Sequence, residues 1–451
     1  MRACAIIEAA WRDPVSVAAA FADEDHAVCL LSDGGRDARW SYLARSPSGV
    51  ADIPPGDPRD PIAVAQAMLG PRLPARADGP PFQGGLIGLA SYELGARLES
   101  LPLVPAEGWP DLSLAFYPAV LAFDHAKSRV LALGRGEDDA EAESRARDAL
   151  SWLGASAAPR NWSGPLAESY AATEPPETYE AAVAEVVEAI AAGEIFQANI
   201  ARTWTGTLSA GIAPFDLFAR LAATSPAPFC AYWRLPGRAV VSNSPERFLK
   251  VEAGKDGLMA LTQPIKGTLP RGATPAEDAR LAAALEASAK DRAENLMIVD
   301  LMRNDLSRVS IPGSVKVPEL FVVESYANVH HLVSTVIGAL QPERDALDLF
   351  GAAFPPGSIT GAPKIQAMKV IARYESRRGP YCGSLFWAGV DGAFDSSVLI
   401  RTAPLRELDG AWRFEVRAGA GIVADSRPTA ERDETGDKAA MFRKALTEAA
   451  P

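Results

Sequence analysis

Two groups of charged residues are spaced so that their side chains would share one face of a helix. Asp291 and Glu294 lie three residues apart in AKDRAENLMIVDLMRND, and Glu431, Glu434 and Lys438 occupy positions i, i+3 and i+7 of RPTAERDETGDKAAMF. A hard cation such as Mg²⁺ takes oxygen ligands and keeps several waters, so carboxylates from two helices could form a cage for it. Each group alone is also compatible with a solvated helix face that carries ordinary ion pairs.

A lysine and a glutamate outside these segments could take part in covalent and acid–base chemistry. Lys266 stands in PIKGTLPRG with little other charge nearby. A lysine is a nucleophile only when its amine is neutral, which burial or a neighbouring cation can bring about. Glu246 in SNSPERF could act as a general acid if it is desolvated, and the adjacent His330 and His331 could be core residues or proton carriers. Taken alone, Lys266 is more typical of a solvated lysine in a loop.

Two glycine-containing segments resemble nucleotide-binding motifs without matching them. Gly419, Gly421 and Ala424 fit GxGxxA, but the next helix is expected only from about Pro428, too late for a dinucleotide site. We expect instead a tight turn that requires glycine, or exposed backbone N–H groups that hold a carboxylate or phosphate. In PPGSITGAPK, two residues separate the second glycine from the lysine, so this segment is not a P-loop.

The composition limits the kinds of partner that this chain is expected to bind. Of the 451 residues, 48% are hydrophobic and 23% are charged, which is typical of a soluble globular protein. The formal net charge is −12 and there is no long Lys/Arg run, which argues against a nucleic acid or an anionic membrane as partner. The four cysteines are far apart, and neither a signal peptide nor a membrane-spanning run is evident, so we expect reduced thiols in the cytoplasm.

Helices and strands that do not alternate strictly must position these residues. Residues 1–150 mix short strand-like runs and turns, and residues 154–177 are rich in Ala, Ser, Pro and Gly, as in a linker. The patterns predict helices over 60–70, 138–153, 178–192, 275–306, 344–353, 362–375 and from about 428. They predict strands over 228–234, 238–242, 246–251, 315–323, 333–340, 384–391, 396–404 and 411–418. This arrangement favours an α+β fold over a doubly wound parallel sheet.

Seven segments occur in the order seen in the chorismate-utilising enzymes, and the chain resembles that family. They are PIKGTLPRG, AENLMIVDLMRNDLSRV, ESYANVHHLVSTVIG, FPPGSITGAPKIQAM, RRGPYCGSLFW, SSVLIRTA and AGAGIVADSRPTAERDETGDKAAMF. The resemblance implies an α+β fold of two large β-sheets packed as a sandwich, with helices outside and the substrate in a cleft. It implies an N-terminal half over 1–153, a linker over 154–177 and a chorismate-binding catalytic region over 178–451.

The resemblance also assigns roles to individual residues. It implies that Glu294 and Glu434 hold Mg²⁺ against the ring carboxylate of chorismate, with Asp291 and Glu431 as nearby support. It implies that Gly419 and Gly421 offer backbone donors to a substrate carboxylate. It implies that Arg401 and Lys438 are carboxylate-binding cations. Thr268, His331 and Tyr381 would also line the cleft.

Two positions distinguish the branches of this family. The branches that add water carry a lysine base where this chain has Gln197, which indicates ammonia as the nucleophile here. Anthranilate-forming relatives carry PIAGT, whereas Lys266 resembles the branch that makes 4-amino-4-deoxychorismate. In that branch the lysine amine would attack C2 of chorismate while Glu246 protonates the departing 4-hydroxyl, and ammonia would then add at C4.

Other functions and partners remain open at this point. The first alternative is the first component of an anthranilate synthase, and the second is a catalytically silent chorismate-binding subunit or metabolite sensor. The chain ends soon after Phe442 with no glutaminase or lyase segment, so we expect a separate glutaminase subunit to supply ammonia. No nucleic-acid or membrane partner is expected.

Overall fold

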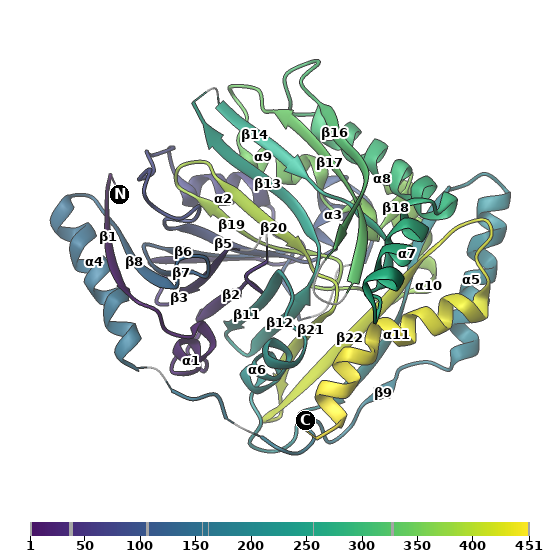
Figure 1. Cartoon of the computed structure of the whole chain (residues 1–451), viewed down its shortest axis with the longest axis horizontal. Helices are drawn as coiled ribbons and strands as arrows, with labels where there is room; N and C mark the ends of the chain where they lie inside the picture. Colours follow the sequence, from purple (N-terminus) through teal and green to yellow (C-terminus); the bar gives the residue numbers. More distant parts are fainter. Residues whose placement is uncertain are drawn as a thin grey trace.

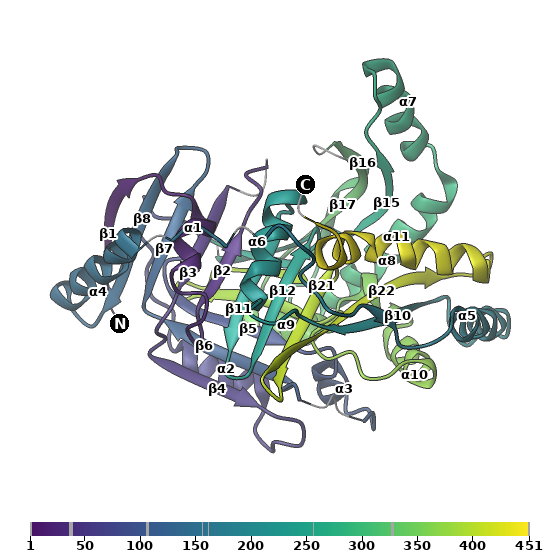
Figure 2. The ribbon, with the colours of Figure 1, turned by 90° about the horizontal axis from the view of Figure 1, so that it is seen from below.

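The computed structural model describes residues 2–35, 39–104, 108–155, 157–160, 162–255, 257–325 and 329–449. Within these residues the chain forms two large antiparallel sheets with helices around them (Figures 1 and 2). The helices are α1 (Pro14–Ala19), α2 (Pro61–Leu69), α3 (Leu94–Leu98), α4 (Asp139–Trp152), α5 (Pro176–Ala191), α6 (Pro214–Thr224), α7 (Pro275–Glu286), α8 (Ala289–Ser307), α9 (Ala346–Ala353), α10 (Lys364–Tyr374) and α11 (Pro428–Thr447), with 3₁₀ turns η1 (Leu153–Ala155) and η2 (Gly357–Ile359).

The first sheet joins strands from both ends of the chain. In spatial order its strands are β1 (Ala3–Ala10), β8 (Arg129–Gly136), β7 (Ala119–Asp124), β3 (Trp40–Ala44), β2 (Val28–Leu31), β11 (Phe229–Leu235), β12 (Arg238–Ser244), β21 (Thr402–Leu408), β22 (Ala411–Ile422), β10 (Gln197–Thr207) and β18 (Gly361–Ala362), with β9 (Ala171–Ala172) also paired to β10. Strands β2 and β11 join its N-terminal and C-terminal parts.

The second sheet is assembled in the same way. Its order is β15 (Ile265–Pro270), β17 (Val329–Ala339), β14 (Gly257–Thr262), β13 (Arg247–Gly254), β20 (Phe394–Val398), β19 (Ser384–Gly389), β5 (Gly85–Ala90), β6 (Leu112–Tyr117) and β4 (Gly49–Ile53), and β16 (Lys316–Ser325) pairs with β17. Here β19 and β5 join the C-terminal and N-terminal parts. Strands from both sides of residues 154–177 therefore share both sheets, and the domain boundaries drawn from the sequence stay a prediction.

Alternating side chains of the strands pack into separate cores. On β11, Ala231 and Trp233 belong to the cluster that also holds Ile87 and Trp387 of the second sheet, so this cluster fills the space between the sheets. Successive side chains of a strand point to opposite faces. Cys230 and its alternate neighbours accordingly face the other way, into a cluster shared with α1, α6 and α11. A further cluster lies under α2, α8 and α9 on the outer face of the second sheet. The predicted α+β sandwich with helices outside is confirmed.

The chain passes from one sheet to the other at two neighbouring places. Strand β12 of the first sheet ends at Ser244 and β13 of the second begins at Arg247, while β20 of the second sheet ends at Val398 and β21 of the first begins at Thr402. The single strand predicted over 396–404 is therefore wrong. It is interrupted because Arg401 adopts a left-handed φ of 49°, which an extended strand cannot include.

One predicted helix is also divided. The stretch 275–306 forms α7 and α8, which are separated at Ala287 and Ser288. The Ser288 side chain accepts a hydrogen bond from the backbone N–H of Asp291, so Ser288 starts a new helix instead of continuing the old one. The remaining predicted helices and strands correspond to elements of the structure within a few residues. Among the described residues, no helix has both the length and the apolarity needed to cross a membrane.

Candidate active site

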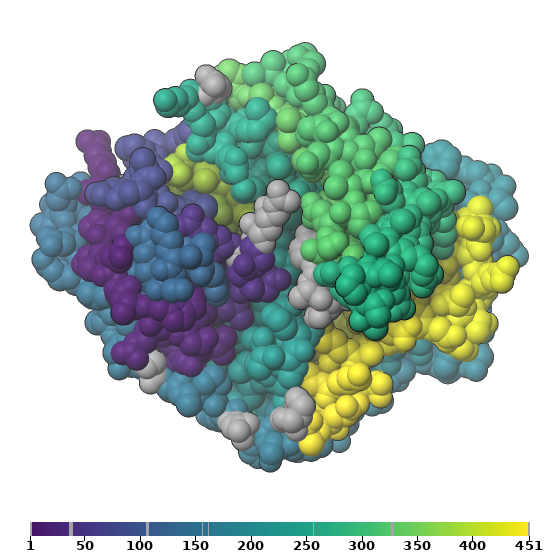
Figure 3. Space-filling model, viewed as in Figure 1, coloured from purple at the N-terminus to yellow at the C-terminus, as the bar shows by residue number. Residues whose placement is uncertain are grey.

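A cavity of about 630 Å³ lies among strands of both sheets and the helices α8 and α11. In the view of Figure 3, the surface of the C-terminal helix (yellow) borders the green surface that includes α7. Every residue assigned a site role from the sequence lines this one cavity, namely Glu246, Lys266, Thr268, Asp291, Glu294, His331, Tyr381, Arg401, Gly419, Gly421, Glu431, Glu434 and Lys438.

The two sheet crossings place Glu246 and Arg401 in the wall of this cavity. The crossings are paired with each other, because the backbone N–H of Val398 donates to the Glu246 carbonyl at 3.0 Å and that of Asn243 donates to the Arg401 carbonyl at 2.8 Å. Both side chains therefore sit on a backbone that is fixed by hydrogen bonds. Since neither residue belongs to a strand, their side chains are not committed to either sheet face.

Lys266 and Thr268 come from β15, an element that the sequence patterns did not predict. The pairing of β15 with β17 shifts at Gly267, a bulge with φ of 78°, and the four consecutive residues from Ile265 to Thr268 line the cavity. Gly267 also approaches α8 closely, because a Cβ atom there would lie 2.8 Å from Cγ of Asp291. Lys266 is therefore not a solvated loop residue, and its strand brings it toward the carboxylates of α8.

Glu246 is buried and Lys266 is partly buried, which disfavours their charged forms. Burial lowers the pKa of the Lys266 amine, although Glu246 and Glu294 act in the opposite direction. Burial likewise raises the pKa of the Glu246 carboxyl, while Ser358 and Lys266 act to lower it. The neutral amine of Lys266 and the neutral carboxylic acid of Glu246 are therefore easier to form here than in water.

The helical carboxylates face the cavity mouth from two sides. Burial raises the pKa of Glu294, and the charges of Asp291 and Glu434 raise it further. Burial also raises the pKa of Glu431, whose carboxylate accepts a hydrogen bond of 2.7 Å from the Ser426 hydroxyl. Like charges that face one another in this way would be relieved by a bound cation.

The carboxylates do not yet form a closed cage. Glu434 pairs with Lys438 at 2.6 Å, and Glu294 lies 3.8 Å from the Lys290 ammonium. No group of three or more His, Cys, Asp or Glu side chains in the described part of the chain is close enough together to hold a metal ion. The four-carboxylate arrangement expected from the sequence is therefore distributed around the mouth of the cavity, and the assignment of metal ligands stays a prediction.

Gly419 and Gly421 lie inside the long strand β22, so the alternative of a tight turn is wrong, whereas their predicted role as backbone donors to a substrate carboxylate stays a prediction. They are needed for a different reason. A Cβ atom on Gly419 would come within 2.3 Å of Oδ1 of Asn199 and 3.0 Å of the Tyr381 hydroxyl, and one on Gly421 would come within 2.4 Å of Nε2 of Gln197. These glycines leave room for the polar side chains that cross the strand from β10.

Cationic and polar groups also line the cavity. Among the described residues no carboxylate pairs with the Arg401 guanidinium, and burial lowers the pKa of Arg401. The nearby His331 is 8% exposed and its Nδ1 lies 2.9 Å from Oγ1 of Thr268. Burial and the positive charge of Arg401 lower the pKa of His331 to about 4. The Lys438 ammonium donates to the Gly419 carbonyl at 3.0 Å. The cavity can therefore accept an anion with carboxylate groups.

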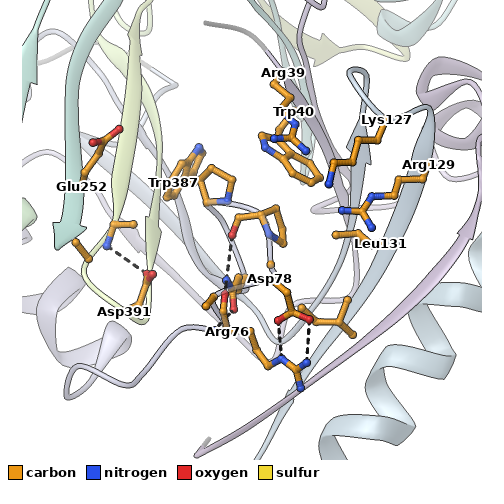
Figure 4. Close-up of a pocket in the computed structure, with 18 of the residues that line it drawn as sticks. Arg39, Trp40, Arg76, Asp78, Lys127, Arg129, Leu131, Glu252, Trp387 and Asp391 are labelled. Atoms are coloured by element: carbon orange, nitrogen blue, oxygen red, sulfur yellow. Dashed lines mark hydrogen bonds and ion pairs between the residues drawn. The ribbon is translucent and has the colours of Figure 1, made fainter. Parts of the chain in front are cut away.

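A larger hollow of about 870 Å³ lies elsewhere and holds none of these residues (Figure 4). Most of its cations are paired with carboxylates: Arg76 pairs with Asp78 at 3.0 Å, Arg129 with Glu8 and Arg39 with Asp124. Lys250 likewise pairs with Glu252. Volume alone therefore does not identify the site, whereas the convergence of a buried lysine, a buried glutamate and facing carboxylates does.

Some cavity-lining residues escaped the sequence reasoning. Ser358 and Ile359 lie in η2, within PPGSITGAPK, a segment to which the sequence assigned no site residue. Asn199 enters from β10 and had no motif of its own. The run of consecutive Pro and Gly residues before Ser358 was the one available signal, since it indicates a tight, specifically shaped segment.

Comparison with known proteins agrees with this site. The model of the chorismate binding enzyme family matches residues 27–444. Aminodeoxychorismate synthase component 1 of Escherichia coli (strain K12) is 41% identical over 392 residues, which cover 86% of this chain and 83% of that protein. Anthranilate synthase component 1 of Streptomyces coelicolor is 39% identical over 460 residues, covering 97% and 87%. The crystal structure of anthranilate synthase component I from Streptococcus pneumoniae TIGR4 superposes with a TM-score of 0.79 at 29% identity, covering 91% of this chain and 93% of that one. The chain belongs to the family of chorismate binding enzymes.

Proposed function

We propose that this chain is the chorismate-aminating component of an aminodeoxychorismate synthase, which converts chorismate and ammonia to 4-amino-4-deoxychorismate, a precursor of p-aminobenzoate and folate. The observation that carries the proposal is the position of Lys266, whose amine lies in the cavity with Glu246 and donates to the Ser358 carbonyl at 3.0 Å. Relatives with the name aminodeoxychorismate synthase component 1 support it at 41 to 43% identity.

Chorismate carries two carboxylates, and the cavity offers cations for them. The Arg401 guanidinium, which has no carboxylate partner among the described residues, would take one carboxylate. The Lys438 ammonium, which pairs with Glu434 in the free protein and donates to the Gly419 carbonyl, would take the other once Mg²⁺ binds Glu434. His331 is neutral at pH 7 and can hydrogen-bond to the substrate without adding charge. Fixing both carboxylates orients the ring between Lys266 and Glu246.

Glu294 and Glu434 are the residues we propose to hold Mg²⁺, with Asp291 and Glu431 in support. They suit this ion because Mg²⁺ needs few protein ligands and because the like charges at the mouth otherwise raise the pKa of Glu294. When bound, Mg²⁺ would neutralise a substrate carboxylate and fix its position.

The chemistry follows from the two buried groups. The neutral Lys266 amine forms a bond to C2 of chorismate, the ring double bonds shift, and the bond from C4 to its hydroxyl oxygen breaks. Glu246 gives its proton to that oxygen, which leaves as water. Ammonia then forms the C4–N bond, the double bonds shift back, and Lys266 departs with its bonding electron pair. The two steps together replace one difficult displacement by two easier ones.

Ammonia must reach this cavity from another source. Relatives named as a first component imply a second component, and we propose that a glutaminase subunit supplies ammonia to this chain. Free ammonium at alkaline pH should replace it in vitro, because only the uncharged form is nucleophilic. The amination step can therefore be tested on this chain alone.

The decisive experiment identifies the product. The purified chain is incubated with chorismate, Mg²⁺ and ammonium at alkaline pH, with and without an aminodeoxychorismate lyase. We expect chorismate to be consumed and p-aminobenzoate to appear only when the lyase is present. Direct formation of fluorescent anthranilate would assign the chain to the anthranilate branch, and no consumption by folded protein would favour a binding or sensing role.

Variants test the roles proposed for single residues, whereas the identity of the product tests the proposed function. Lys266→Ala should abolish the amination at C4, whereas Lys369→Ala, on the exposed side of α10, should leave it unchanged. Glu246→Gln cannot donate the proton to the leaving hydroxyl and should lower kcat by roughly 10²- to 10⁴-fold. A Lys266→Ala variant with full activity would remove the covalent step while leaving the proposed product intact.

A further inference from the structure

Strand β10 brings to the cavity wall two amide side chains to which the site described above assigns no ligand. Gln197 and Asn199 are alternate residues of this strand, so their side chains point to the same face. Asn199 is 7% exposed and lines the cavity. Gln197 is fully buried beside Gly421, where an added Cβ atom would lie 2.4 Å from Nε2 of Gln197. The two amides thus lie next to each other on the face of β10 that is turned to the cavity.

These amides lack hydrogen-bond partners. Among the described residues, neither Oδ1 of Asn199 nor either amide atom of Gln197 has a partner, although all three atoms are buried. The backbone of Asn199 is nevertheless fixed, because its N–H donates to the Thr360 carbonyl at 2.9 Å and its carbonyl accepts from the Arg378 guanidinium at 2.7 Å. Buried polar groups in folded proteins are usually paired. Unpaired amides on a fixed strand therefore indicate a ligand that supplies the missing hydrogen bonds.

The segment around η2 brings Asn199 close to Lys266. The Lys266 amine donates to the Ser358 carbonyl at 3.0 Å, and the backbone N–H of Asn199 donates to the carbonyl of Thr360, two residues further along. Both residues therefore lie against the same short segment of the wall. In the proposed reaction, nitrogen bonds first to C2 and then to C4 of chorismate, and one ring carbon separates these two atoms. The group that holds the second nitrogen must consequently lie near Lys266, as Asn199 does.

The chemistry of an amide suits ammonia. An amide oxygen is an uncharged acceptor, so it can hold an N–H of ammonia without the preference for ammonium that a carboxylate would have. Ammonium has no lone pair and cannot attack the ring. Half a turn of the Asn199 amide exchanges Oδ1 and Nδ2, which brings the acceptor to the cavity. An N–H held by Oδ1 leaves the lone pair of the nitrogen free to face the ring.

We propose that Asn199, with Gln197 next to it, is the binding site for the ammonia that attacks chorismate. This inference rests on the proposed function, in which ammonia is the second nucleophile. Chorismate is held by other groups of the cavity, namely Arg401 and Lys438. The two substrates therefore have separate contacts, and a change at Asn199 acts on one of them.

The test measures the two substrates separately. The full chain is assayed with Mg²⁺ and an aminodeoxychorismate lyase at alkaline pH, and ammonium and chorismate are varied in turn. Loss of one hydrogen bond in Asn199→Leu should raise KM for ammonium by about 3- to 10-fold, with KM for chorismate little changed. Asn199→Ala, which adds no atoms, and Gln197→Met should act in the same way. The matched control is Thr205→Val, at an exposed position further along β10, which should change neither constant.

Two further measurements distinguish a binding site from a structural role. Because Oδ1 of Asn199 has no partner among the described residues, Asn199→Leu should melt at a temperature no lower than the unaltered chain does. At limiting ammonium, mass spectrometry should show that this variant still forms the covalent adduct with Lys266. It should retain more of that adduct than the unaltered chain, because the step that consumes it needs ammonia.

The outcomes separate this inference from the proposed function. An unchanged KM for ammonium in the Asn199 variants, or an equal rise in KM for chorismate, would overturn the inference. Melting of Asn199→Leu well below the unaltered chain would overturn it in favour of a structural role. If the unaltered chain does not consume chorismate with ammonium, the proposed function fails and the ammonia site with it. If it makes anthranilate, the product assignment fails, while the two KM values still test Asn199.

Discussion

His331 should remain neutral at a pH where an ordinary histidine is protonated. Its ring is 8% exposed on β17, and the Arg401 guanidinium adds positive charge to the same wall of the cavity. Burial is the larger cause, and together the two lower the pKa of His331 from its usual 6.5 to about 4. The neutral ring is the form that can share a hydrogen bond with Thr268 next to an anionic substrate.

The shift gives a stability that depends on pH, with a definite sign. The pKa of His331 is lower in the folded state, so as the pH falls the unfolded chain takes up the proton first. The folded state therefore loses stability as the pH falls from about 6.5 toward 4. A shift of roughly 2.5 pKa units corresponds to about 3 kcal/mol below pH 4, of which about 2 kcal/mol is already lost at pH 5.

Two measurements test this. The chain has four histidines, so ¹H–¹⁵N spectra of the imidazole groups can be assigned by the signal that His331→Gln removes. That signal should show no protonation between pH 8 and about 5. In denaturant unfolding, the free energy of unfolding of the unaltered protein should fall between pH 7.5 and 5 by about 2 kcal/mol more than that of His331→Gln. A His331 signal that titrates near pH 6.5, or the same pH dependence in both proteins, would refute the reasoning.

Two further predictions concern the support of the site. Arg378 and Glu375 form a buried ion pair at 2.8 Å, and Arg417 lies 3.9 Å from the same carboxylate. Arg378→Met should lower the free energy of unfolding by about 3 kcal/mol, because it removes the nearer of the two cations from a buried carboxylate. Denaturant unfolding of this variant and of the double variant with Glu375→Leu would show whether the second change recovers stability. Gly419→Ala should raise KM for chorismate, since the new Cβ would push the Asn199 amide and the Tyr381 hydroxyl toward the cavity. An unchanged KM would contradict this close fit.

Much of the fold followed from local patterns. Strand-like runs such as 238–242 and helical runs such as 362–375 have a clear periodicity, and each became an element with nearly the expected bounds. The errors occur where side-chain hydrogen bonding or backbone conformation overrides periodicity. Ser288 starts a new helix within an otherwise continuous helical pattern, and the left-handed φ of Arg401 ends a strand within a run that reads as one.

The site was harder to foresee from residue types than from the resemblance. Taken alone, Lys266 was typical of a solvated lysine, and only its place on β15 beside α8 shows that it is partly buried. A turn was one of two interpretations of the glycines of β22, but they lie in a strand and leave space for side chains of β10. Ser358 was not singled out from its residue type, since its backbone contact with Lys266 joins parts of the chain about a hundred residues apart. Such pairings depend on the sheet topology, which local patterns do not encode.

The sheet crossings explain why ionisable residues could be kept buried here. The side chain of a strand residue must point to one face of its sheet. Glu246 and Arg401 lie between strands, so their side chains can face the cavity without disturbing either sheet. Holding Arg401 there without a carboxylate partner among the described residues costs stability in the free protein. An anionic ligand supplies the missing partner of Arg401, so the free energy of unfolding rises with ligand concentration. The same burial that makes the free site unfavourable is what brings the Lys266 amine and the Glu246 acid toward their neutral, reactive forms.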